Sequence, residues 1–475
     1  MSRLTSNRLL IFVVYLLMIG ASLGAYYLIV QHGQGLPFTP ADTPHGPEGD
    51  QTQKVNHLLH VLLALAVVII TARAVGVIFK FIGQPPVIGE VVGGILLGPS
   101  FLGRLAPNAY AFLLPKSAAP FLGVIAQLGI IFYMFVVGLE LDLKVLRRSG
   151  HAALAISHAS IIAPFLMGAW LATHIFTTLA PAGVPFLNFS LFLGVSMSIT
   201  AFPVLARILT DKGLQKTKMG TIALTCAAVD DVTAWCLLAF VVSLVQSRLG
   251  GAFVTLGLTI IYITLMFLFV GPLVRRLVPW LEKFDTVTEE GIALFFLGLL
   301  VSALLTEFIG IHAIFGAFLL GAITPHKSRL AQELTDRIED LVRIMFLPAF
   351  FAFTGMRTEF GLLSSQADWV ICGWIIVVAS LGKFGGTLFA ARVTGLRWHE
   401  SAALGVLMNT RGLVELIVLN LGFDLGIISP QLFTMLVCMA LVTTFATAPM
   451  LHLLIRSAPW LAPNTSPMIS KSNEH

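Results

Sequence analysis

Long apolar stretches constrain the fold of this chain more than any other feature of its sequence. Most of them reach the roughly 20 residues that a helix needs to cross a bilayer. Fourteen can be marked by hydropathy, at residues 9–30, 57–80, 84–103, 121–142, 151–179, 187–209, 218–247, 252–274, 291–309, 311–325, 344–361, 369–394, 399–421 and 430–455. Hydrophobic residues make up 57% of the 475 residues and charged residues only 11%, against about 25% in soluble domains. The pattern predicts an all-α polytopic membrane protein and excludes a soluble enzyme, a nucleic-acid binder and a disordered scaffold.

The first apolar stretch has two interpretations, an uncleaved span or a signal peptide. It follows two arginines, Arg3 and Arg8, as either would. Its length of roughly 22 apolar residues exceeds that of a normal signal-peptide core, which favours a span. We therefore expect 13 core transmembrane helices plus an extra N-terminal span.

The distribution of lysine and arginine predicts the orientation. With the N-terminus inside, 21 of the 29 fall in inner loops or tails and three within spans, while five, among them Arg104 and Arg357, fall outside. Positive residues concentrate in cytoplasmic loops. We therefore expect a multi-pass protein of a bacterial inner membrane with a cytoplasmic C-terminus.

The second half of the chain repeats the first. Residues 193–198, LGVSMS, match residues 404–409, LGVLMN, and Leu224-Thr225-Cys226 match Leu436-Val437-Cys438. Matching spans lie seven apart, an odd number, so the second copy is expected to be inverted in the membrane. Inverted repeats are typical of secondary transporters that work by alternating access. The expected division is an N-terminal span with its outer loop (1–56), repeat one (57–247), a linker helix with an inner loop (248–288), repeat two (289–457) and a cytoplasmic tail (458–475).

Two matched spans contain helix-breaking residues. The residues concerned are Ser198, Thr200 and Pro203 in the first repeat and Asn409, Thr410 and Arg411 in the second. Proline lacks the backbone N–H that a helix interior requires, and Gly412 is conformationally permissive. For one span alone the simpler interpretation is a proline kink or a packing glycine. In matched spans we expect discontinuous crossing helices, whose exposed carbonyls can help to coordinate a cation.

Two adjacent acidic residues, Asp230 and Asp231, lie at the centre of the span 218–247. Charged groups at this depth are costly and are functional candidates by default. Neighbours on a helix point about 100° apart, so one can face a solvated cavity while the other meets a neighbouring helix. Two such close carboxylates are not expected to ionise freely together, so one can hold a proton and release it to an entering cation. The alternative is a purely structural pair balanced by lysine or arginine.

Other charged residues within spans allow more than one interpretation. Lys383 is expected to pair with a mid-membrane aspartate, either during transport or as a static counter-ion. Arg411 and Glu415 are spaced i, i+4, which suits a local ion pair as well as a role in offsetting the dipoles of the broken helices. For Glu90 a helix-start or packing role is favoured over an accessory role in a proton path.

At these residues the chain resembles the monovalent cation:proton antiporter-2 family, the sodium or potassium–proton exchangers. The motifs that carry the resemblance are GQPPVIGE (83–90), GLEL (138–141), TAFPVLAR (200–207), VDD (229–231), GIHAIFGA (310–317), Lys383 and NTRGLVE (409–415). The resemblance implies a core domain, here 151–247 and 369–457, that slides against a dimerisation domain, and hence a homodimer. It also implies Asp231 as the principal carrier of cation and proton, Asp230 as the partner of Lys383, and electrogenic exchange.

The expected function is secondary antiport of Na⁺ or K⁺ against H⁺, with both ions competing for the buried aspartates. The alternative is a sodium-coupled symporter of a small organic anion on a similar fold. An intramembrane aspartyl protease needs facing carboxylates on different helices, whereas Asp230 and Asp231 are neighbours on one. The expected metal is a monovalent cation at Asp231 and Asp230 only, and no catalytic residue, organic cofactor or nucleic-acid partner is expected.

Overall fold

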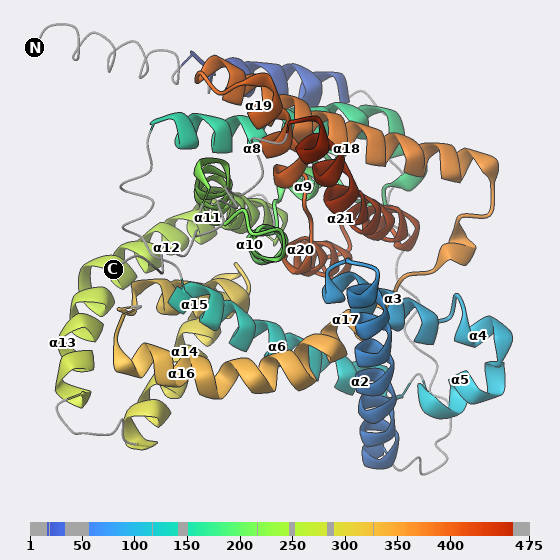
Figure 1. The fold of residues 1–475 in the computed structure, drawn as a ribbon. Helices are drawn as coiled ribbons and strands as arrows, with labels where there is room; N and C mark the ends of the chain where they lie inside the picture. Colours follow the sequence, from blue (N-terminus) through green and yellow to red (C-terminus); the bar gives the residue numbers. More distant parts are fainter. Residues whose placement is uncertain are drawn as a thin grey trace, which may run out of the picture.

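The computed structural model describes residues 17–18, 20–33, 57–115, 117–140, 151–215, 217–246, 252–282, 289–325 and 327–458. Within these ranges, which include residues 17–18 and 20–33, all regular structure is helical (Figure 1). The first half contains α2 (His57–Phe81), α3 (Pro86–Leu97), α4 (Leu102–Leu105), α5 (Pro107–Leu113), α6 (Ala119–Glu140), α8 (His151–Leu179), α9 (Phe186–Ser198), α10 (Phe202–Asp211) and α11 (Lys218–Gln246).

The second half contains the π-helical turns η1 (Met266–Val270) and η2 (Val342–Phe346) and the 3₁₀ turn η3 (Phe360–Leu362). Its α-helices are α12 (Ala252–Leu265), α13 (Gly271–Leu281), α14 (Glu289–Ile309), α15 (Ala313–Ile323), α16 (Arg329–Leu341), α17 (Leu347–Met356), α18 (Gln366–Val393), α19 (Trp398–Met408), α20 (Leu413–Asp424) and α21 (Pro430–Ser457).

Ten helices among the described residues are long and apolar enough to cross a membrane, and the bent pair α19–α20 makes an eleventh. The polytopic membrane class is therefore confirmed, while the count of 13 core spans stays a prediction. One expected span is short in the structure, since α15 has 11 residues. The apolar stretch 344–361 is continuously helical as far as Met356, because η2 runs directly into α17, and the 3₁₀ turn η3 follows. Much of the stretch 9–30 lies outside the described residues.

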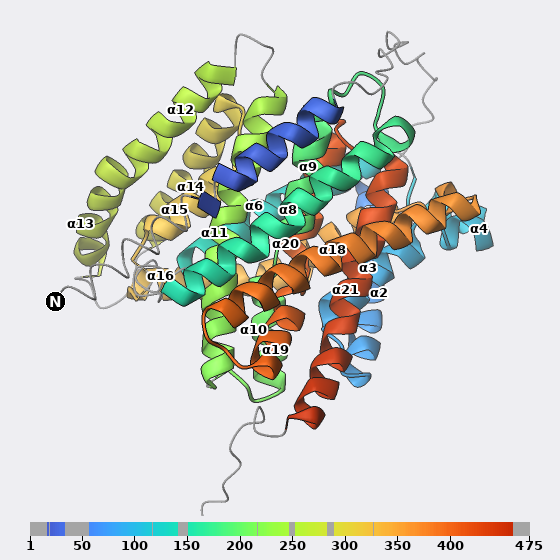
Figure 2. The same ribbon diagram turned by 90° about the horizontal axis from the view of Figure 1, so that it is seen from above.

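The helices form two groups that meet at the broken helices. In Figure 1, α8, α18, α19 and α21 lie in the upper part of the view, whereas α6, α14, α15 and α16 lie in the lower part. The close packing of α8 with α9 and α18, and of α6 with α15 and α17, follows the same division. Seen from above, α11, α10 and α20 lie near the centre of the molecule (Figure 2). For brevity we call α8–α11 with α18–α21 the core group and α2–α6 with α12–α17 the scaffold group.

Both predicted breaks are present. In the first, α9 ends at Ser198 and α10 begins at Phe202; in the second, α19 ends at Met408 and α20 begins at Leu413. Pro203 lies in the first turn of α10, where a missing N–H costs nothing. The proline thus starts a half-helix instead of kinking a continuous one. The backbone N–H of Ala201 donates to the carbonyl of Thr410 over 2.9 Å, which joins the two breaks directly.

Two glycines of α18 bring it unusually close to α8. A Cβ atom at Gly382 would lie 2.6 Å from the Cα of Pro164, and one at Gly386 would lie 2.7 Å from the carbonyl oxygen of Ala159. Only glycine permits such an approach, as in other membrane helix pairs with small residues at the contact. The contact places Lys383, between the two glycines, inside the core group.

Candidate functional site

Asp230 and Asp231 lie in the middle of α11, in the turn nearest the two helix breaks. The side chain of Asp230 is completely buried, and Asp231 is 5% exposed. Their directions differ because neighbouring residues of a helix project about 100° apart. Each carboxylate therefore has its own environment.

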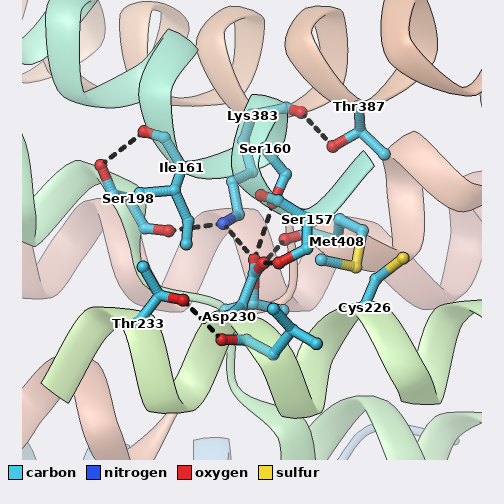
Figure 3. A network of polar contacts seen from close by, with 12 residues as sticks. Ser157, Ser160, Ile161, Ser198, Cys226, Asp230, Thr233, Lys383, Thr387 and Met408 are labelled. Carbon is cyan, nitrogen blue, oxygen red and sulfur yellow. Dashed lines mark hydrogen bonds and ion pairs between the residues drawn. The ribbon is translucent and has the colours of Figure 1, made fainter. Parts of the chain in front are cut away.

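The Asp230 carboxylate accepts four hydrogen bonds from three directions (Figure 3). Ser157 Oγ of α8 donates to Oδ1 over 2.5 Å. The other oxygen, Oδ2, accepts from Ser160 Oγ at 2.7 Å, Thr200 Oγ1 at 2.8 Å and Lys383 Nζ at 3.0 Å. Both carboxylate oxygens of Asp230 are thus hydrogen-bonded, to α8, α18 and the first break.

Lys383 joins the aspartate to the end of a half-helix. Besides the ion pair with Asp230, its Nζ donates to the carbonyl oxygen of Ser198, the last residue of α9, over 2.5 Å. The C-terminus of a helix carries a partial negative charge and unsatisfied carbonyls. The lysine therefore satisfies both a buried carboxylate and the end of α9.

Asp231 lacks such a set of donors. Its Oδ1 atom is buried and has no hydrogen-bond partner among the described residues. The side chain lines a cavity of about 330 Å³, together with Phe202 and Pro203 at the start of α10. A buried carboxylate oxygen without a protein partner is costly unless a proton, water or a cation occupies it. This oxygen is the atom on which an ion can bind.

The cavity leads from Asp231 toward the predicted inner face. Along α11 its lining runs through Thr225 and Thr221 toward the N-terminus of the helix at Lys218, and Glu140 lines it at the end of α6. The loops at both of these helix ends are among those in which positive residues predict a cytoplasmic location. The cavity therefore lies toward the side that the sequence predicts to be cytoplasmic, and Asp231 is the lining residue of α11 farthest from that side.

Arg411 and Glu415 form a second buried ionic group in the second break. The two side chains are fully buried and their charged atoms lie 2.9 Å apart, as the i, i+4 spacing allows. The guanidinium also donates to the carbonyls of Ser196 and Met197 of α9, over 2.7 and 2.6 Å. Both interpretations from the sequence therefore describe real contacts, because Arg411 pairs locally and also satisfies the end of α9.

The remaining predicted residues have distinct positions. Thr410 Oγ1 donates to the carbonyl of Leu407 over 2.6 Å, and Asn409 Nδ2 donates to Ser380 Oγ over 3.4 Å. Glu90 lies on α3, where its nearest cation is Arg73 of α2 at 4.0 Å. This contact joins two scaffold helices and fits the packing role that the sequence favours for Glu90.

The sequence analysis missed two donors of the site, Ser157 and Ser160. They lie three residues apart on one face of α8 and are both completely buried. The sequence pattern that could have identified them is a pair of hydroxyls at helical spacing in an otherwise apolar span. The sequence marked Glu140 only as part of the GLEL motif, because its place at the cavity depends on where the end of α6 lies in the tertiary structure.

The oxygen-rich chemistry of the site suits a small hard cation. The cavity is lined by the carboxylates of Asp231 and Glu140 and by the hydroxyl-bearing residues Thr221 and Thr225. Within the described part of the chain, no group of three or more His, Cys, Asp or Glu residues could hold a metal ion as a cluster. The arrangement favours an alkali cation over a transition metal, which prefers nitrogen and sulfur ligands.

Comparison with known proteins relates this chain to cation/proton antiporters. Residues 61–455 match the family described as "Sodium/hydrogen exchanger, transmembrane". The chain is 44% identical to the Na⁺/H⁺ antiporter NhaS4 of Synechocystis over 397 residues, which cover 83% of this chain and 97% of that protein. It is 41% identical to cation/H⁺ antiporter 20 of Arabidopsis thaliana and 35% identical to K⁺/H⁺ antiporter 1 of Saccharomyces cerevisiae, matching 82% of this chain in each case. It spans about half the length of these two relatives, 48% and 46%.

A solved structure shares the fold. The sodium–proton antiporter MjNhaP1 from Methanocaldococcus jannaschii superimposes with a TM-score of 0.60, covering 86% of this chain and 98% of that one. Sequence identity in this comparison is 14%. The likeness therefore establishes the helical architecture.

Proposed function

Since this chain belongs to the sodium/hydrogen exchanger family, we propose that it exchanges Na⁺ or K⁺ for protons by alternating access, with both ions competing for Asp231. As a monovalent cation/proton antiporter, it needs one group that binds either ion but not both. The relatives are named for Na⁺/H⁺ and for K⁺/H⁺ exchange, so both cations are candidates.

One observation supports Asp231 as this group. Of the two adjacent aspartates, Asp230 has four donors, whereas Asp231 has an oxygen without a partner at the deep end of an open cavity. Burial beside a second carboxylate favours the protonated form of Asp231, and an arriving cation favours its ionised form. The proton therefore leaves when the cation binds.

The cycle then follows from the position of the cavity. In the inward-open arrangement, Asp231 exchanges its ion with the cytoplasm through the Thr225–Thr221 side of α11. Movement of the core group relative to the scaffold group then exposes the same carboxylate outside. The homodimer and the electrogenic stoichiometry that the resemblance implies belong to this proposal and stay predictions.

Symport of a small organic anion fits the cavity less well. Among the described residues, the charged side chains of its lining are the two acids Glu140 and Asp231. These carboxylates would repel an anion in the cavity and attract a cation.

The proposal is tested with purified protein in liposomes that contain a pH-sensitive dye. Addition of Na⁺ or K⁺ across an imposed proton gradient is expected to move protons, and Asp231→Asn is expected to abolish this movement. The apparent KM for the cation should fall as the pH rises, because fewer protons compete. Normal exchange by Asp231→Asn, or a KM that does not depend on pH, would refute the assignment, and cation uptake without proton movement would favour symport.

A further inference from the structure

On the predicted outer side, a group of contacts centred on Arg357 joins the core and scaffold groups. Arg357 directly follows α17 of the scaffold group. Its Nη1 atom lies 2.7 Å from Oδ1 of Asp424 and donates to Oδ1 of Asn420 over 3.1 Å, and both partners belong to α20 of the core group. One side chain thus bonds two residues of the other group.

Aromatic rings from both groups hold the same guanidinium. Its carbon lies 4.0 Å from the ring centroid of Phe353 in α17 and 5.3 Å from that of Phe423 in α20. Arginine binds favourably over aromatic faces at such distances. The guanidinium is therefore placed between one ring of each group as well as paired with a carboxylate.

Two further hydrogen bonds connect the groups close by. Asn420 Nδ2 donates to Thr354 Oγ1 of α17 over 2.8 Å. The backbone N–H of Glu359, two residues after Arg357, donates to Thr434 Oγ1 of α21 over 3.1 Å. Both α20 and α21 are thus fastened to the scaffold at this end.

Beneath these contacts only a small space remains between the two groups. A cavity of about 20 Å³ lies there, lined by Ile130 of α6, Phe353 of α17 and Ile417, Asn420 and Asp424 of α20, among others. It has room for about one water molecule. The inner cavity at Asp231 measures about 330 Å³, so the outer side is closed where the inner side is open.

We propose that Arg357 is the outer gate of the exchanger: its contacts with Asp424, Asn420 and Phe423 hold the core against the scaffold and must break before the outer pathway opens. This inference rests on the proposed alternating-access function. Removing the gate contacts shifts the population from the inward-open toward the outward-open arrangement, since they exist in only one of the two.

The test measures the accessibility of single cysteines in a background in which Cys226, Cys236, Cys372 and Cys438 are replaced by serine. Ile417→Cys reports the outer side and Thr225→Cys the inner cavity. Each is labelled with a membrane-impermeant maleimide in vesicles of known orientation. With Arg357→Gln, labelling at 417 from outside should become roughly three- to tenfold faster, and labelling at 225 from inside slower, as expected for losing an ion pair and a cation–π contact.

Control variants separate a gate from general loosening of the structure. Arg104→Gln, which removes an exposed arginine on the predicted outer side, should leave both labelling rates unchanged. Arg357→Lys keeps the charge and should give an intermediate rate. Asp424→Asn, which is nearly isosteric, should reproduce the effect of Arg357→Gln even if the latter folds poorly.

Two outcomes would overturn the gate: parental labelling at 417 in both Arg357→Gln and Asp424→Asn, or faster labelling at 417 and 225 together. Labelling does not depend on ion exchange. If the gate is wrong, Asp231→Asn should still abolish exchange. If Asp231→Asn exchanges normally, the proposed function is refuted, but the labelling result does not change.

Discussion

The ammonium group of Lys383 lies 3.0 Å from the Asp230 carboxylate and 2.5 Å from the carbonyl oxygen of Ser198. Both charged side chains are completely buried. A buried ion pair adds little to the stability of the folded protein by comparison with apolar residues in the same place. Removing one partner, however, leaves the other charge buried without compensation. This asymmetry determines what substitution of the lysine will do.

Lys383→Ala is expected to destabilise the protein by about 3–5 kcal/mol, because the Asp230 anion loses its buried partner. The thermal unfolding temperature in detergent should fall, and exchange should change in apparent cation affinity, pH profile or electrogenicity. Lys327→Ala, which removes an exposed lysine, is the matched control and should change none of these. Parental stability and exchange in Lys383→Ala would demonstrate that the pair is dispensable.

Ser157→Ala and Ser160→Ala are each expected to cost about 1.5–3 kcal/mol, the usual contribution of a hydrogen bond to a charged group. Chemical unfolding of each variant beside the parent protein measures this cost.

Thr443→Val is the control for these serine variants, because the Thr443 hydroxyl donates to carbonyls of its own helix, α21. Its cost should be smaller than that of either serine variant. Serine variants that cost no more than Thr443→Val would mean that their hydrogen bonds to the Asp230 carboxylate contribute no more than a bond to a backbone carbonyl.

Because Arg411 and Glu415 are paired, we expect the effects of their substitutions on stability not to be additive. Arg411→Met should be strongly destabilising because it leaves a buried acid unpaired. The double variant Arg411→Met with Glu415→Leu should be more stable than Arg411→Met alone, since the uncompensated charge is gone. Thermal unfolding of the two variants decides the matter, and a double variant that is less stable than the single one would contradict the prediction.

Two glycines of α18 form a matched pair for testing the contact with α8. Gly382→Ala places a methyl group 2.6 Å from the backbone of Pro164 and should cost about 1–3 kcal/mol through overpacking. At Gly385 an added Cβ meets no atom within 4 Å, so Gly385→Ala should be neutral or stabilising by about 0.5–1 kcal/mol through helix propensity. Equal unfolding temperatures for the two variants would show that the helices can separate without cost.

The membrane class and the position of both helix breaks were predictable from the sequence, because hydropathy and helix-breaking residues act locally. The run from Ser198 to Pro203 is interrupted in the structure between Ser198 and Phe202, as its residue types indicate. The expected span 344–361 is helical as far as Met356, and hydropathy alone does not locate that end of the helix before the 3₁₀ turn.

The charged residues of the site could be predicted from the sequence, but the serine hydroxyls that donate hydrogen bonds to Asp230 could not. Asp230, Asp231 and Lys383 stand out because charge is rare in apolar spans. Ser157 and Ser160 are common residues in membrane helices, and only the packing of α8 against α11 and α18 gives them a partner. The outer contacts of Arg357 likewise depend on tertiary structure, because 67 residues separate it from Asp424.

Two hydrogen bonds tie the interrupted segments together, from the Ala201 N–H to the Thr410 carbonyl and from Thr200 Oγ1 to the Met408 carbonyl. On the proposed function, they keep the oxygens of the two breaks together while the protein changes shape. An ion released on one face has then been held by the same ligands as on the other. Discrimination between sodium and potassium should accordingly be equal for uptake and for release, and the direction of net flux is left to the gradients alone.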